Sequence, residues 1–162
     1  MIKLLRVDHR LLHGQVAFSW TRAVEADCIL IANDSVIKDE IWKTTLKLAK
    51  PQGVKLVIKG IDDSIDSINS GVTDKYNLLI IVQNIEDARK LAENCPQVKS
   101  INLGGVINKG ETKQLGKAVY VTDEELKIFK ELVGKGIEIE IRQLPTESKI
   151  YLQDVLYRGK KI

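Results

Sequence analysis

Leu78-Leu79-Ile80-Ile81-Val82 decides the fold, because five consecutive apolar residues without alternation are typical of a strand covered on both faces. Other short apolar runs predict strands at residues 3–7, 28–32, 54–58, 98–103 and 119–121. The last run, residues 137–141, alternates strictly between isoleucine and glutamate, which predicts an edge strand with one face in water.

The segments between these runs carry helical patterns. A helix is expected from near Ser35 to Pro51, and a final one over residues 148–157. Asn84 with Asp87, and Thr122 with Glu125, are pairs that cap a helix at its start. Alternation of strands and helices predicts an α/β fold: a single doubly wound, mostly parallel open sheet of about seven strands, the last one or two of them at the edge, with helices on both faces and residues 1–162 in one domain.

Composition excludes several classes of protein. Lys and Arg number 25 against 22 Asp and Glu, a net charge of +3 that does not argue for a nucleic-acid partner. No apolar run approaches the length of a membrane span, and the charged N-terminus does not resemble a signal peptide, so we expect a cytoplasmic location. Two cysteines and two histidines fit no metal motif.

The loop after the first predicted strand carries the chemistry. It reads Arg6-Val7-Asp8-His9-Arg10-Leu11-Leu12-His13-Gly14-Gln15-Val16 and holds both histidines of the chain. In open parallel sheets, reactive sites lie beyond the carboxyl ends of the strands. Gly14 lets a ligand approach the backbone, the helix starting near Gln15 offers free N–H groups, and Arg10 offers a planar fork. These features favour a phosphoryl group.

His13 can serve there as an electrophile, a base or a nucleophile. A nucleophilic role requires one free ring nitrogen, with the proton of the other nitrogen held by an acceptor. Asp8 is the nearest candidate acceptor in the sequence, and we expect it to orient His13.

The motif Asp8-x-Arg10-Leu11-x-His13-Gly14-Gln15-Val16 resembles the active-site motif of the IIB component of the mannose/fructose/sorbose family of the bacterial phosphoenolpyruvate-dependent sugar phosphotransferase system (PTS). The resemblance extends to residues 32–36 and 102–105, and so covers essentially the whole chain. The family fold is an open, mostly parallel sheet flanked by helices. One departure is His9, at a position that is often acidic in the family, and we expect it to be a bystander.

The resemblance implies a phosphocarrier without metal or organic cofactor. His13 would accept a phosphoryl group from a phosphohistidine of the IIA component and pass it to a sugar carried by the IIC/IID membrane components. Arg10 would stabilise the phosphoryl charge. The cleft rim is expected to contain Gly14, Gln15, Asn33, Asp34, Gly104 and Gly105. A structural interpretation stays open for four of these, with Asn33 and Asp34 as part of a helix cap and Gly104-Gly105 as a tight turn.

Other classes fit less well. Cys28 and Cys95 lack the surroundings of a reactive thiolate, although cysteine is the phosphoryl carrier in other IIB families. Histidine phosphatases place an arginine directly before their nucleophile, where this chain has Leu12, and need a later histidine that it lacks. An anion-binding module that transfers nothing stays possible. The basic end at residues 158–161 is interpreted as a solvated tail or a docking site for an anionic partner or membrane surface.

Overall fold

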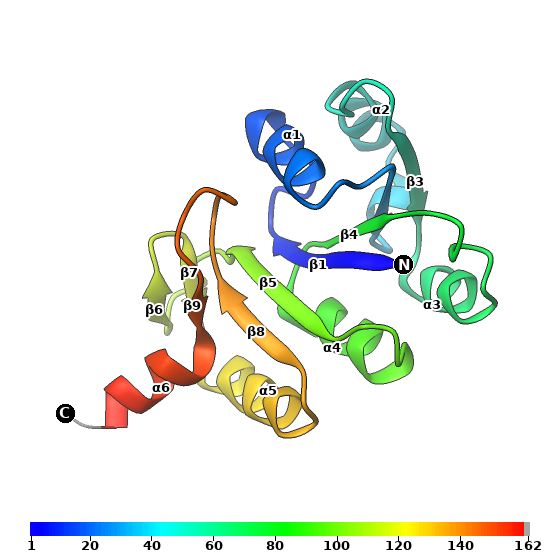
Figure 1. The fold of residues 1–162 in the computed structure, drawn as a ribbon. Coiled ribbons are helices and arrows are strands. Elements are labelled where there is room, and N and C mark those ends of the chain that lie inside the picture. Colours follow the sequence, from blue (N-terminus) through cyan, green and yellow to red (C-terminus); the bar gives the residue numbers. More distant parts are fainter. Residues whose placement is uncertain (161–162) are drawn as a thin grey trace.

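The computed structural model describes residues 1–160, and the side chains of residues 1–156. The strands of the main sheet are β1 (Ile2–Asp8), β2 (Cys28–Ala32), β3 (Lys55–Lys59), β4 (Leu78–Val82), β5 (Ser100–Gly105), β8 (Glu138–Ile141) and β9 (Ile150–Tyr151). Their order is β3-β2-β4-β1-β5-β8-β9 (Figure 1), and all neighbours are parallel except β8 and β9. The predicted fold class is confirmed.

Helices cover both faces of this sheet (Figure 1). They are α1 (Gly14–Ala23), the 3₁₀ turn η1 (Val36–Lys38), α2 (Glu40–Leu48), α3 (Ile61–Asn69), α4 (Ile85–Asn94), α5 (Asp123–Gly134) and α6 (Leu152–Lys160). Leu79 and Ile81 pack in the cluster that holds α1 and α2, whereas Ile80 packs in the one that holds α3, α4 and α5. Two covered faces therefore explain why β4 is apolar throughout. No helix in the described part of the chain has both the length and the apolarity to cross a membrane.

Two strand predictions need correction. The run at residues 137–141 forms β8, which is not an edge strand, because the short strand β9 pairs along its outer side. Its Glu140 is buried and pairs with Arg142, whereas the side chain of Glu138 at the start of the strand is 41% exposed, so only part of the glutamate face is in water. The predicted strand at 119–121 is β7 (Val119–Val121), which lies outside the main sheet and pairs with β6 (Lys113–Gly116) in an antiparallel hairpin.

The helix boundaries follow local capping chemistry. Asn84 and Thr122 cap α4 and α5 as predicted, and Thr122 forms the full capping box with Glu125. The helix expected from Ser35 is instead the η1 turn followed by α2, which Asp39 caps by accepting from the N–H of Trp42. The last helix begins at Leu152, because the residues before it pair with β8. The side chains of the basic end, residues 158–161, lie outside the described part of the chain.

Asp34 caps a helix that is distant in sequence. Its Oδ1 accepts a hydrogen bond of 2.9 Å from the N–H of Ile61, the first residue of α3. The N-cap residue of that helix, Gly60, has no side chain to do this, and a β-carbon there would lie 2.9 Å from Asp34 Oδ1. Asp34 therefore joins the loop after β2 to the start of α3.

We expect Asp34→Ala to lower the free energy of unfolding by about 1 kcal/mol, the usual cost of a lost cap. Urea denaturation followed by circular dichroism measures this. Asp66→Ala, on the exposed side of the same helix, is the matched control and should change stability by less than about 0.5 kcal/mol. Equal stability of Asp34→Ala and the wild type would show that the cap contributes nothing.

Candidate functional site

The sequence motif lies at the carboxyl end of β1, in the middle of the sheet (Figure 1). β1 leads into α1 on one face, while its neighbours β4 and β5 lead to α4 and α5 on the other. This divergence is the switch point at which open α/β sheets bind ligands. The loop is tightly turned, since Leu11 and Gly14 have φ of 59° and 38°, and the N–H of Leu11 donates to the carbonyl of Asp8.

His13 and Asp8 are hydrogen-bonded. The Nε2 atom of His13 lies 3.1 Å from Asp8 Oδ2. Because an ionised carboxylate only accepts hydrogen bonds, Nε2 must carry the ring proton, and Nδ1 keeps its lone pair. The His13 side chain is 25% exposed, whereas that of Asp8 is fully buried. The pair is thus an oriented imidazole with a nucleophilic nitrogen and a buried acceptor behind it.

Asp8 is held as a carboxylate. Its Oδ1 accepts from the backbone N–H of Arg10 at 3.0 Å and from Arg10 Nε at 3.3 Å. Burial raises the pKa of Asp8, but the N–H of Arg10, the charge of Arg6 and the bond to His13 together outweigh it and lower that pKa below its usual value. Asp8 is therefore charged at neutral pH.

Two kinds of group that can bind an anion belong to the same loop as His13. Arg10 uses Nε for Asp8, and its side chain is 42% exposed, so both terminal nitrogens are available for an anion. His13 is itself the N-cap residue of α1, and no side chain caps that helix start. The first N–H groups of α1, at Gly14 and Gln15, are then open to a ligand.

A second cation lies on the inner side of Asp8 and was not predicted. Arg6 is 2% exposed; it donates to Asp8 Oδ2 at 3.2 Å and to Asn102 Oδ1 at 2.6 Å. A signal for Arg6 and Asn102 was available, because each stands between two apolar residues of a central strand. Charged residues are rarely fully buried unless they are paired.

Gly104 and Gly105 end β5 and do not form the tight turn that the structural interpretation allowed. A β-carbon on Gly104 would lie 2.1 Å from Arg6 Cζ, and one on Gly105 would lie 3.1 Å from Asp8 Oδ1. Both glycines border the polar cluster, and their role is to make room for it.

The remaining rim residues lie farther out. Asn33 is buried and accepts from the N–H groups of Ser35 and Val36, so it stabilises the turn after β2. It reaches the site only indirectly, because its amide donates to Gln83, and Gln83 donates to the carbonyl of His9. Asp34 binds the start of α3 and, among the described residues, forms no hydrogen bond with the loop of His13.

The other candidate groups do not form a reactive cluster. The Nδ1 atom of His9 is buried, 4.0 Å from Asp8 Oδ1, and has no hydrogen-bond partner. Burial raises the pKa of the Cys95 thiol to about 11 and also raises that of Cys28, so neither is a thiolate at neutral pH. Among the described residues, no group of three or more His, Cys, Asp and Glu side chains is placed to hold a metal ion.

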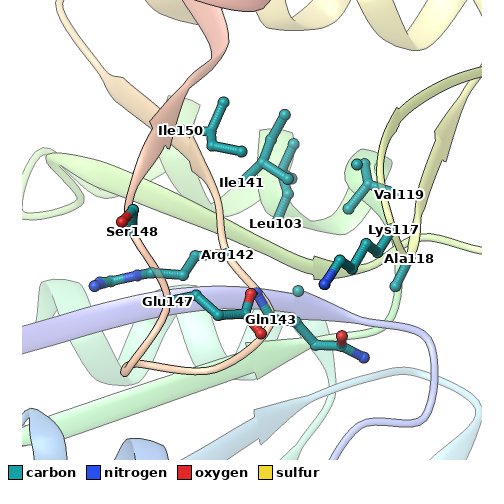
Figure 2. A pocket seen from close by; sticks show the side chains of 12 residues that line it. Leu103, Lys117, Ala118, Val119, Ile141, Arg142, Gln143, Glu147, Ser148 and Ile150 are labelled. Atoms are coloured by element: carbon teal, nitrogen blue, oxygen red, sulfur yellow. The ribbon is translucent and has the colours of Figure 1, made fainter.

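A pocket of about 100 Å³ lies at the same edge of the sheet (Figure 2). Its floor is apolar, with Leu103, Val119 and Ile141. Figure 2 shows Lys117, from the turn of the β6–β7 hairpin, pointing toward the pocket, whereas Arg142 points away from it. The carbonyl of Gln143, at its border, accepts from Arg6 and from Trp20, so the pocket and the buried cluster share one wall.

Comparison with known proteins places these features in a family. The profile of the PTS system sorbose subfamily IIB component matches residues 2–162. The sorbose-specific EIIB component of Lacticaseibacillus casei is 32% identical over 147 residues, which are 91% of this chain and 90% of that protein. The mannose-specific EIIAB component of Escherichia coli K12 is 31% identical over 99% of this chain, which spans 50% of that protein.

A solved structure of a family member has the same fold. The crystal structure of the IIBSor domain of the sorbose permease from Klebsiella pneumoniae has a TM-score of 0.91 and 27% sequence identity, and the match covers 98% of this chain and 97% of that one. Profile, relatives and fold all lead to one assignment. The chain belongs to the sorbose subfamily of PTS IIB components, the phosphotransferase components that act with other PTS proteins in sugar uptake.

Proposed function

We propose that His13 is the phosphocarrier of this IIB component. It accepts a phosphoryl group on Nδ1 from a phosphohistidine of the IIA component and passes it to a sugar carried by the IIC/IID membrane components. The observation that carries the proposal is the 3.1 Å contact between His13 Nε2 and the buried Asp8, which leaves Nδ1 as the free nitrogen. The whole chain acts as one cytoplasmic domain.

Two transfers follow from this geometry. In the first, the Nδ1 lone pair attacks phosphorus while the P–N bond to the donor imidazole breaks and its electron pair returns to the donor. In the second, a sugar hydroxyl oxygen attacks phosphorus, the hydroxyl proton passes to water, and the P–Nδ1 bond returns its electrons to His13. Asp8 holds the Nε2 proton throughout and stabilises the ring when Nδ1 is substituted.

The protein must also neutralise charge. The phosphoryl group in flight spreads negative charge over three equatorial oxygens, so positioning and electrostatic stabilisation supply most of the catalysis. The terminal nitrogens of Arg10 and the N–H groups at the start of α1 are the available donors. Because His13 and Arg10 are both partly exposed, donor and acceptor proteins can reach them in turn.

Incubation with the phosphorylated IIA donor should place one acid-labile, base-stable phosphoryl group on His13, and His13→Ala should abolish it. Mass spectrometry of peptides separated at alkaline pH locates the group. A Cys28→Ala, Cys95→Ala double variant should keep it, because both thiols are buried and protonated.

His9→Asp is the matched control, since it changes the other histidine of the same loop and should retain phosphorylation. Phosphate on a cysteine, or its complete loss in His9→Asp, would overturn the assignment. Binding of the donor without retained phosphoryl on His13 would support an anion-binding module instead.

Arg10→Lys should slow single-turnover transfer from the donor by about one to three orders of magnitude, the range expected when one charge-stabilising donor is degraded. Lysine keeps the charge but loses the planar fork. Arg10→Ala should be slower still, because the charge is lost as well. Rapid-quench measurement of phosphoprotein formation gives the rates.

Arg22→Lys, at the exposed end of α1, is the control for a general effect of arginine replacement and should transfer at the wild-type rate. Circular dichroism checks that each variant is folded. Wild-type rates in both Arg10 variants would mean that the phosphoryl group is held by backbone N–H groups near Gly14 alone.

A further inference from the structure

Among the side chains that the structure describes, Arg6 is the most buried charge that the transfer scheme does not use. It sits in β1, two residues before Asp8 and on the same side of the strand, with 2% of its side chain exposed. Besides Asp8 and Asn102, its terminal nitrogens donate to the carbonyls of Arg142 at 3.3 Å and Gln143 at 3.1 Å. Four acceptors from three strands or their ends therefore fix one guanidinium.

The surroundings fit this guanidinium closely. The indole of Trp20 lies 5.3 Å from Arg6 Cζ and donates its own N–H to the carbonyl of Gln143. On the β5 side, a β-carbon on Gly104 would enter the space that the guanidinium occupies, at 2.1 Å from Cζ. Hydrogen-bond acceptors, the indole and the Gly104 backbone thus hold the Arg6 guanidinium against Asp8.

We propose that Arg6 is a positioning residue for phosphoryl transfer, and that Gly104 is its spacer: Arg6 fixes the carboxylate of Asp8, and Asp8 in turn fixes the ring orientation and the tautomer of His13. The transfer measurements that test this inference rest on the proposed role of His13. Oriented second partners of this kind set the tautomer of functional histidines in general.

The charges around Arg6 and Asp8 determine what the loss of Arg6 would do. Asp8 faces Arg6, Arg10, His9 and His13, all of them cationic or able to become so. Arg6 faces Asp8 and interacts electrostatically with the buried Glu140 of β8. Arg6 and Arg142 both lie against the indole of Trp20.

Removing Arg6 leaves Asp8 buried but takes away one of its main stabilising charges, so the pKa of Asp8 rises. A protonated Asp8 donates a hydrogen bond instead of only accepting one. Nε2 of His13 then loses its obligate acceptor, and the tautomer with the proton on Nδ1, which has no lone pair to attack phosphorus, becomes populated. Phosphoryl transfer slows, and in its pH–rate profile the fall in rate on the acid side moves to higher pH.

The first measurement uses the unphosphorylated wild-type protein. The ¹⁵N chemical shifts of the His13 ring should show the Nε2–H tautomer at alkaline pH. A ¹³C titration should show that the Asp8 carboxyl takes up its proton only below pH 3.8, its ordinary pKa. A predominant Nδ1–H tautomer, or an Asp8 that titrates above that value, overturns the proposal without any variant.

The second measurement uses Arg6→Met and Gly104→Ala. Both should populate the Nδ1–H tautomer, shift the acid limb of the pH–rate profile upward, and slow single-turnover transfer by about 10–100-fold, the usual effect of losing a second-layer partner. Because both act on the same guanidinium, the double variant should be no slower than the slower single one. Arg10→Lys should slow transfer yet leave the tautomer unchanged.

Gly134→Ala and Arg22→Lys are matched controls. A β-carbon on Gly134 meets nothing within 4 Å, and Arg22 is an exposed arginine, so neither should alter the tautomer or the profile. Folded Arg6→Met or Gly104→Ala protein with the wild-type tautomer and pH profile would overturn the proposal. Failure of the wild type to take up phosphoryl on His13 would instead refute the proposed function, and the tautomer measurements would still decide the role of Arg6.

Discussion

The carboxylate of Asp8 is fully buried, so protein groups must satisfy both of its oxygens. One oxygen is shared by Arg6 and His13, and the other by the backbone and side chain of Arg10. An unpaired charge at this depth would cost several kcal/mol, so the residues around it are tied to one arrangement. Three features fit that arrangement: the close turn of the loop, the two glycines of β5 and the course of the chain after β8.

The site has a rigid inner layer and an accessible outer layer. Arg6, Asp8 and Asn102 come from the central strands β1 and β5, where packing fixes their positions. His13 and Arg10 come from the loop and the start of α1, where both are partly exposed. A phosphocarrier needs both properties: its nucleophile must be oriented before the partner arrives, and it must be reached by two partners in succession.

The segment that follows β8 connects this site to the rest of the sheet edge. Its backbone carbonyls at Arg142 and Gln143 accept from Arg6, while Gln143 and Glu147 line the neighbouring pocket. The antiparallel strand β9 and the hairpin β6–β7 close the other sides of that pocket. The elements at the end of the sheet thus support the reactive loop without contributing a nucleophile.

The sequence alone determined the α/β class, most strands, the caps at Asn84 and Thr122, and the loop of His13 with Asp8 and Arg10. Those features are local: apolar runs, capping pairs and a motif of nine residues carry them. Tertiary structure decided that Glu140 is buried, that β9 rather than β8 forms the edge, that Asp34 caps α3, and that Arg6, Asn102 and Gly104 lie together beside Asp8. Each of these depends on partners from 27 to 137 residues away, or on a strand pairing, and the order of residues in a sequence does not say which distant residues meet.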